Sequence, residues 1–208
     1  MLSDLSRLLK GALFFLFCLA AAPVQAGTLL VMGDSLSAAY GLSSPDAGWV
    51  SLLSDRLSEE HTVVNASISG ETTRGGLQRL PGLLDRYQPD HVILELGGND
   101  GLQGQNIPEI RQRLQDMIDL SAAADAEVIL LGIRIPPNYG PRYTEPFFNM
   151  FGELAEANDL DYFLPFLLDS VAEDPDLMQS DGIHPTAAAQ PIILENVWSI
   201  LPEALTEP

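Results

Sequence analysis

The chain has 208 residues, 46% of them hydrophobic, and its 29 acidic residues outnumber its 10 basic residues to give a formal net charge of −19. This length predicts one domain with a full hydrophobic core. So large an excess of negative charge argues against nucleic acid and against anionic lipid headgroups as partners.

The N-terminal segment has the pattern of a secretory signal peptide. Arg7 and Lys10 supply a short basic region, residues 11–22 form an apolar run, and Val24-Gln25-Ala26 supplies a cleavage site. The apolar run is shorter than the roughly 20 residues that a membrane-spanning helix needs. We therefore expect cleavage after residue 26, no stable membrane insertion, a periplasmic or secreted location and a single domain over residues 27–208.

The only cysteine, Cys18, lies inside this apolar run. The expected mature chain therefore contains no cysteine, which excludes disulfides and thiol chemistry even though the expected compartment is oxidising. We expect its stability to come from packing alone.

Five short apolar runs predict buried strands at residues 28–32, 62–65, 91–96, 127–132 and 162–166. Apolar residues at helical spacing predict helices at 49–57, 77–84 with a bend at Pro81, 110–118 and 147–157, and a last helix at about 185–201. Residues 133–143 are rich in Pro, Gly and Asn and predict a loop. Nearly all-apolar strands that alternate with helices indicate an α/β fold with a parallel sheet covered on both faces.

Turn segments with reactive groups follow the first three strands or precede the last helix. They are Gly33-Asp34-Ser35, Ser69-Gly70-Glu71, Gly97-Gly98-Asn99-Asp100 and Asp181-Gly182-Ile183-His184-Pro185. The carboxyl ends of parallel strands lie on one edge of a sheet, and ligand sites form beyond that edge. The sequence therefore predicts that these segments converge.

Ser35 is the candidate nucleophile because its turn can project the hydroxyl above the sheet. A serine in this position is more often a helix cap. The G-x-S-x-G elbow of ordinary α/β-hydrolases is absent, since Ser37 replaces the second glycine. Acyl transfer also needs a base, a group that orients the base, and donors for the developing oxyanion.

His184 is the candidate base by elimination. His91 begins the strand that leads to Asn99, which places it roughly 26 Å from the reactive edge at about 3.3 Å per residue. His61 precedes its own strand and follows two glutamates, as a surface residue does. Asp181 lies three residues before His184 and can orient its ring.

Asn99 can donate its side-chain amide to an oxyanion, with the backbone N–H groups of Gly70 and Ser35 completing the hole. The alternative is that Asn99 and Asp100 bond turn amides, which we expect for Asp100. Scattered histidines indicate no metal site, and no glycine-rich motif for nucleotides is present.

Together these segments resemble the SGNH (GDSL) hydrolase family from Thr28 nearly to the C-terminus. The similarity includes residues 63–70, 95–102, 134–140 and 181–185. Within that family the chain looks most like the bacterial periplasmic thioesterase and lysophospholipase group, with arylesterases as near relatives. The resemblance implies a flavodoxin-like, three-layer fold with five parallel strands, no cofactor, and hydrolysis of esters, thioesters or lysophospholipids.

For the site, the resemblance implies Ser35 as nucleophile, Asp181 and His184 as the rest of the triad, and Ser35, Gly70 and Asn99 as oxyanion donors. It also implies that residues 74–80 and the loop at 133–143 line an acyl groove. The loop supplies the candidate substrate-binding residues Arg134, Pro136, Asn138 and Tyr139. We expect a monomer whose partner is a small acyl ester or lipid.

Two alternatives remain open. One is a carbohydrate O-acetylesterase on the same scaffold, and the other is a non-catalytic protein that binds lipids or glycans in the same groove.

Overall fold

A computed structural model describes residues 27–57 and 61–206, and the expected signal segment lies outside these residues. In chain order the elements are β1 (Thr28–Gly33), η1 (Pro45–Ala47), α1 (Trp49–Arg56), β2 (Thr62–Asn65), α2 (Thr73–Tyr87), β3 (His91–Glu95), α3 (Gly98–Leu102), α4 (Ile107–Ala123), β4 (Glu127–Leu131), η2 (Pro137–Tyr139), α5 (Pro141–Ala157), β5 (Tyr162–Leu164), η3 (Ala187–Ala189), α6 (Gln190–Trp198) and α7 (Glu203–Thr206).

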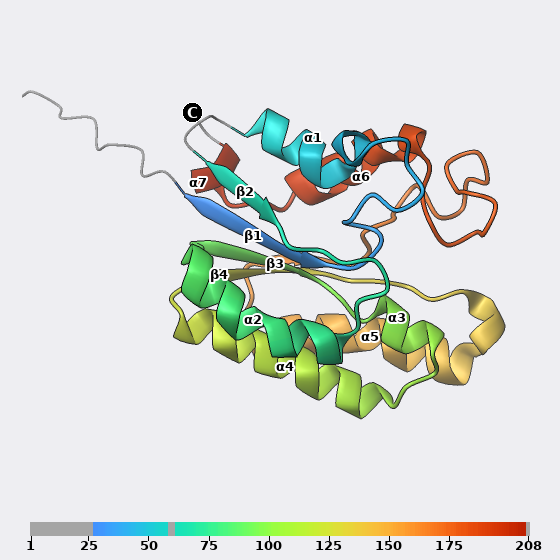
Figure 1. Cartoon of the computed structure of the whole chain (residues 1–208). Helices are drawn as coiled ribbons and strands as arrows, with labels where there is room; N and C mark the ends of the chain where they lie inside the picture. Colours follow the sequence, from blue (N-terminus) through green and yellow to red (C-terminus); the bar gives the residue numbers. More distant parts are fainter. Residues whose placement is uncertain (1–26, 58–60, 207–208) are drawn as a thin grey trace, which may run out of the picture.

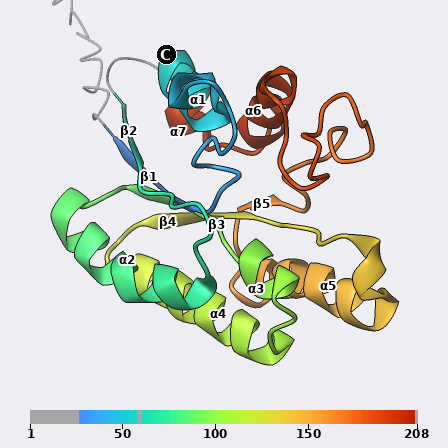
Figure 2. The ribbon, with the colours of Figure 1, turned by 45° about the vertical axis from the view of Figure 1, so that its right-hand side comes forward.

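The five strands form one parallel sheet in the order β2-β1-β3-β4-β5. Helices α1, α6 and α7 cover one face of the sheet, and α2, α4 and α5 cover the other (Figures 1 and 2). The predicted α/β fold with three layers and five parallel strands is confirmed.

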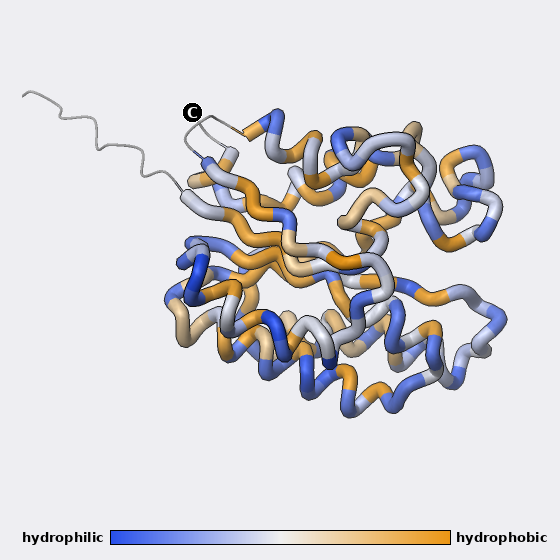
Figure 3. The backbone as a smooth tube through the Cα atoms, viewed as in Figure 1, coloured by the Kyte–Doolittle hydropathy of each residue, from blue (hydrophilic) through white to orange (hydrophobic). Residues whose placement is uncertain are grey.

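Successive side chains of the strands enter opposite layers, so the sheet separates two hydrophobic cores. Leu30 and Met32 of β1 pack in the core beneath α2, α4 and α5, whereas Leu29 and Val31 pack in the core beneath α1 and α6. Figure 3 shows the strands as a hydrophobic band and polar residues along the outer sides of the helices. Because both faces are buried, the strands are almost continuously apolar.

Helix boundaries differ from the predictions more than strand boundaries do. Helix α5 begins at Pro141, six residues before the predicted start, because proline suits the first turn of a helix. Helix α2 begins at Thr73 and continues through Pro81, with the side chain of Thr72 capping its N-terminus. The five-residue helix α3 was not predicted, and the last long helix starts at Gln190, after a short 3₁₀ turn.

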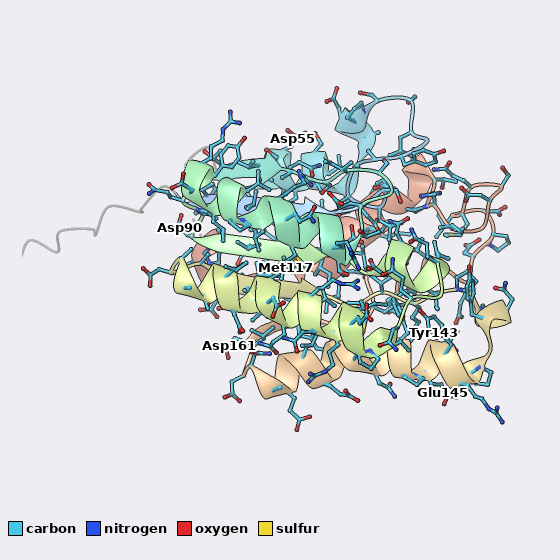
Figure 4. All side chains as sticks on the ribbon, turned by 60° about the horizontal axis from the view of Figure 1, so that its bottom comes forward. Asp55, Asp90, Met117, Tyr143, Glu145 and Asp161 are labelled. Carbon is cyan, nitrogen blue, oxygen red and sulfur yellow. The ribbon has the colours of Figure 1, made fainter. Side chains whose placement is uncertain are left out.

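The amino and carboxyl ends of the strands can be located along the helices that cover them. Figure 4 shows α2, α4 and α5 side by side, with Asp90 and Asp161 at one end and Tyr143 and Glu145 at the other. Asp90 and Asp161 immediately precede β3 and β5, so they mark the amino ends of the strands. Tyr143 and Glu145 therefore mark the carboxyl end. Within the described residues, no helix has both the length and the apolar character of a membrane span.

Candidate active site

The turn after β1 is packed against the end of β3. Gly33 of β1 is in register with Glu95 of β3. A Cβ atom on Gly33 would lie 2.6 Å from the Ser37 side chain and 2.7 Å from the Glu95 carboxylate, so only glycine fits there. This close approach fixes where the chain turns and presents the partly buried Ser35 at the carboxyl edge of the sheet.

Ser35, His184 and Asp181 form a continuous hydrogen-bonded chain. The His184 Nε2 atom lies 2.9 Å from Ser35 Oγ, and His184 Nδ1 lies 2.6 Å from Asp181 Oδ2. With the proton on Nδ1, that nitrogen donates to the carboxylate and Nε2 accepts from the serine hydroxyl. The structure thus brings together three residues that the sequence places up to 149 positions apart.

Asp181 also folds the loop that carries His184. Its Oδ1 atom accepts from the backbone N–H groups of Ile183 at 2.9 Å and His184 at 3.0 Å. These bonds, led by the side-chain bond to His184, lower the pKa of Asp181 to about 2. The carboxylate is therefore ionised throughout the neutral range and can stabilise a positive charge on the imidazole.

Gln179 and Tyr40 connect this loop to the turn that carries Ser35. The Gln179 side-chain amide donates to the backbone oxygens of Tyr40, at 2.9 Å, and Pro185, at 3.0 Å. The exposed Tyr40 ring lies with its centroid 4.5 Å from that of His184. These contacts hold the imidazole beside Ser35 from the solvent side.

Two of the three predicted oxyanion donors, Ser35 and Asn99, line a cavity beside the triad. Within the described residues, the backbone N–H groups of Ser35 and Gly70 donate to no protein acceptor. Gly70 has a φ of +80°, a conformation that glycine adopts readily. The Asn99 amide donates to Asp34 Oδ2 at 3.0 Å and to the Glu71 backbone oxygen at 2.9 Å, so both of its protons are engaged.

Asp100 is structural, although it bonds other segments of the chain rather than the turn amides that we expected. Fully buried, it accepts from the backbone and side chain of Thr73 at 2.8 and 2.6 Å and pairs with Arg113 at 3.1 Å. These bonds tie α3 to the start of α2, the two elements that hold Asn99 and the segment after Gly70 in place.

Two buried acidic residues beside Ser35 were missed by the sequence analysis. Asp34 is 3% exposed and Glu95 is completely buried. Burial raises the pKa of Asp34 to about 6 and that of Glu95 well above its ordinary value, and the negative charge of Asp34 adds to the shift of Glu95. The available signal was an acidic residue at the end of the otherwise apolar strand at residues 91–95.

A cavity of about 660 Å³ opens beside Ser35 and His184. Its walls are mostly apolar, and Arg134 and Pro136 lie among them as predicted. Ile133 and Ile135, from the loop predicted to line the groove, also border it. Further lining comes from residues that the sequence analysis missed, including Phe148, Phe166, Leu167, Leu168 and Met178. The Arg134 guanidinium lies over the rings of Phe148 and Phe166, at 4.3 and 4.6 Å from their centroids.

Other predicted substrate-binding residues lie outside the lining of this cavity. Neither Asn138 nor Tyr139 borders it, and the Tyr139 hydroxyl instead donates to the Leu102 backbone oxygen at 2.7 Å. The segment at 74–80 belongs to α2 and contributes nothing to the wall either. η2 begins at Pro137, which still borders the cavity, and the two residues after it lie outside the lining.

His91 lies at the amino end of β3, where it pairs with Glu127 at 3.2 Å, as its elimination from the site requires. In the part of the chain that the structure describes, no three His, Cys, Asp or Glu side chains group so that they could hold a metal ion.

Comparison with known proteins gives the same family from sequence and from structure. Residues 31–191 match the model of the GDSL-like lipase/acylhydrolase family. The chain is 50% identical to the esterase TesA of Pseudomonas aeruginosa, over 93% of this chain and 96% of that protein. It is 46% identical to thioesterase 1/protease 1/lysophospholipase L1 of Escherichia coli K12, over 87% of this chain and 86% of that one.

Among solved structures, the crystal structure of TesA superimposes with a TM-score of 0.81 and 51% identity, covering 86% of this chain and 99% of that one. Every residue that lines the cavity, from Asp34 to His184, lies within the residues 31–191 that the family model matches. The chain belongs to the GDSL-like lipase/acylhydrolase family.

Proposed function

We propose that this protein is a serine hydrolase that cleaves carboxylic esters and acyl thioesters through an acyl-enzyme intermediate. The observation that carries the proposal is the Ser35–His184–Asp181 chain of hydrogen bonds, with contacts of 2.9 and 2.6 Å, at the mouth of an apolar cavity. Relatives named as an esterase and as a thioesterase and lysophospholipase support the same chemistry.

In the first half-reaction, Ser35 Oγ attacks the acyl carbon while His184 Nε2 takes the hydroxyl proton. The Asp181 carboxylate keeps the other ring nitrogen protonated and stabilises the imidazolium. The imidazolium then gives its proton to the departing alkoxide or thiolate, which leaves Ser35 acylated. In the second half-reaction His184 deprotonates a water molecule, which attacks the acyl-serine. The acid departs as the imidazolium returns the proton to Ser35 Oγ, which restores the free enzyme.

Each tetrahedral intermediate carries a negative oxygen that needs hydrogen-bond donors. The unengaged N–H groups of Ser35 and Gly70 are available without rearrangement. The Asn99 amide becomes available when one of its protons leaves the Glu71 oxygen or the Asp34 carboxylate. We therefore assign all three as donors, with Asn99 the one that must exchange a partner.

The acyl chain fits the apolar side of the cavity. Its lining by aliphatic and aromatic side chains favours a hydrocarbon chain over a sugar, because burial of apolar surface contributes about 25 cal/mol per Å². This favours an esterase or lysophospholipase over a carbohydrate O-acetylesterase. A basic region and apolar run at residues 7–22 support cleavage of a signal peptide and a periplasmic or secreted location.

Two activity measurements on the purified chain from residue 27 test the proposal. Turnover of p-nitrophenyl esters should fall at least about 10⁴-fold in Ser35→Ala, because the nucleophile is lost. The rate for the unchanged chain should rise from acetyl to medium-length acyl groups. Retained turnover in Ser35→Ala would exclude the mechanism, and a strict preference for acetylated sugars would favour the O-acetylesterase alternative.

A further inference from the structure

Glu95 is a completely buried acid in a place where the fold alone would favour an apolar residue. It ends β3, whose four other residues are His91 at the amino end and the buried Val92, Ile93 and Leu94. Burying an ionisable group without full hydrogen bonding costs free energy, so such a residue calls for an explanation. The mechanism above does not use it.

One Glu95 oxygen holds the backbone on both sides of Ser35. Its Oε2 atom accepts from the Asp34 backbone N–H at 3.1 Å and from the Ser37 hydroxyl at 2.7 Å. The other oxygen, Oε1, is buried and has no partner in the described residues. Glu95 thus fixes the residue before Ser35 and the second residue after it, while one of its own atoms remains uncompensated.

Asp34 connects the Ser35 turn to the proposed oxyanion donor Asn99. Its Oδ1 atom accepts from the Leu36 N–H at 3.0 Å, and its Oδ2 atom accepts from the Asn99 amide at 3.0 Å. Asp34 is itself 3% exposed, so it has little access to solvent as an alternative partner. Glu95, Asp34 and Asn99 therefore form one linked set beneath the site.

Both neighbouring carboxyl groups are buried, and burial disfavours the charged form of each. Burial and the nearby Asp34 raise the pKa of Glu95 well above its ordinary value, whereas the pKa of Asp34 rises only to about 6. Asp34 also receives donors from Leu36 and Asn99 and lies near His184, which favour its anion. Burial therefore favours the protonated form of Glu95 more strongly than that of Asp34.

We propose that Glu95 is a positioning residue for hydrolysis: its Oε2 atom fixes the Ser35 turn and, through Asp34, the amide of Asn99. The inference rests on the proposed function, since it assigns Glu95 a part in the same reaction. Glu95 touches no reacting atom. Its contribution is to hold Ser35 and Asn99 in fixed positions relative to each other.

Two substitutions of similar size separate this role from a merely structural one. Glu95→Gln keeps an uncharged acceptor in place of Oε2, so kcat should stay within about threefold of the original. Glu95→Leu removes the acceptor and should lower kcat about 10- to 100-fold with KM nearly unchanged, because small misplacements of reacting groups cost that much. The control is Ser121→Ala, which removes a fully buried hydroxyl bonded to the Met117 oxygen, away from the site.

Rates are expressed per active site, counted by titration with a p-nitrophenyl phosphonate, so that unfolded protein does not enter the comparison. Ser121→Ala should lose stability and keep its kcat per site. The proposal is wrong if Glu95→Leu keeps its kcat per site. It is also wrong if Glu95→Gln loses as much kcat as Glu95→Leu. If Glu95→Leu does not fold, Ser37→Ala replaces it, with an expected loss of about 3- to 10-fold in kcat. An unchanged kcat in Ser37→Ala would then contradict the proposal.

The pH profile gives a readout that a packing defect would not move. The groups that face the Asp34 carboxylate are Glu95 from β3, Asn99 from α3, His184 from its loop, and Ser35 and the Leu36 N–H from its own turn. If Glu95 is uncharged, Glu95→Gln does not change the electrostatic field at His184. The fall of kcat/KM on the acid side should then occur at the same pH as in the original chain. A downward displacement of that fall by about one pH unit would show that Glu95 is charged in the native protein. Hydrolysis retained in Ser35→Ala would instead overturn the proposed function itself.

Discussion

The two halves of the site are built in opposite ways. Ser35 follows a buried strand, and its turn is fixed by the buried acids Asp34 and Glu95. His184 lies in a loop outside any helix or strand, and the side chain of its partner Asp181 is 39% exposed. The proposed nucleophile is therefore positioned by the sheet, whereas the proposed base is positioned by a few local hydrogen bonds.

The two aspartates next to the reacting residues show the same contrast electrostatically. Asp34 loses hydration in the core, and its pKa rises to about 6. Asp181 accepts three hydrogen bonds at the surface, and its pKa falls to about 2. One residue type thus serves two different purposes, because the environments push the two pKa values apart.

The largest effect is expected in the base half. Asp181→Asn should lower kcat roughly 10³- to 10⁴-fold, because an amide no longer fixes the tautomer of His184 or stabilises its positive form. Steady-state hydrolysis of a p-nitrophenyl ester measures the loss. Asp176→Asn, which removes an exposed acid from the same loop, serves as the control and should keep full activity. Comparable losses in both variants would mean that the loop needs its charge rather than this carboxylate.

The next effect belongs to the nucleophile half. Asn99→Ala should lower kcat about 10²- to 10³-fold through loss of one oxyanion donor. Asn158→Ala removes an amide that also bonds a backbone oxygen, that of Leu154, but lies in the turn after α5. It should leave kcat unchanged. A loss below tenfold in Asn99→Ala would indicate that the amide stays engaged with Asp34 and Glu71 during the reaction.

Stability as a function of pH should separate the two aspartates by sign. The raised pKa of Asp34 gives a contribution that is present below the ordinary value of 3.8 and is lost as pH rises through about 6, up to about 3 kcal/mol. The lowered pKa of Asp181 gives a contribution that is present above 3.8 and is lost as pH falls through about 2.

Relative to the original chain, Asp34→Asn should therefore be more stable at pH 7 than at pH 3.5, with a larger free energy of unfolding. Asp181→Asn should become less stable relative to the original chain as pH rises from 2 to 5. Urea unfolding at several pH values provides the measurement. Parallel trends in the two variants would refute the contrast between a buried and an exposed aspartate.

The smallest effect is expected where the two halves are joined. Gln179→Ala removes the donor that connects the backbone oxygens of Tyr40 and Pro185, and it should lower kcat/KM about 3- to 10-fold by loosening the loop of His184. Gln112→Ala breaks an exposed bond to Asp116 on α4 and should have no effect. If both variants retain full activity, the loop is held by Asp181 alone.

Much of the fold was predictable because the strands are buried on both faces. Their nearly continuous apolar runs placed all five strands within two residues, and the turns after them marked the edge where Ser35 and Asn99 lie. The start of α5 was missed because Pro141 and the residues after it have the composition of a loop, although proline is favoured in a first helical turn.

The candidate site was predictable as residues and less so as an arrangement. Ser35 and His184 followed from turn position and elimination, but the burial of Glu95 depends on its register with Gly33, which no local pattern specifies. The cavity wall from Phe148, Phe166 and Met178 comes from three separate segments, which only the fold brings together. Their spacing in the sequence therefore gave no signal.

Covalent labelling tests the central assignment of Ser35 most directly. The purified protein is treated with a p-nitrophenyl phosphonate ester, and the modified residue is located by peptide mass mapping. We predict one adduct per chain, on Ser35, formed together with loss of esterase activity and absent from Ser35→Ala. Inactivation with the adduct on another residue, or equal labelling and inactivation of Ser35→Ala, would contradict the account.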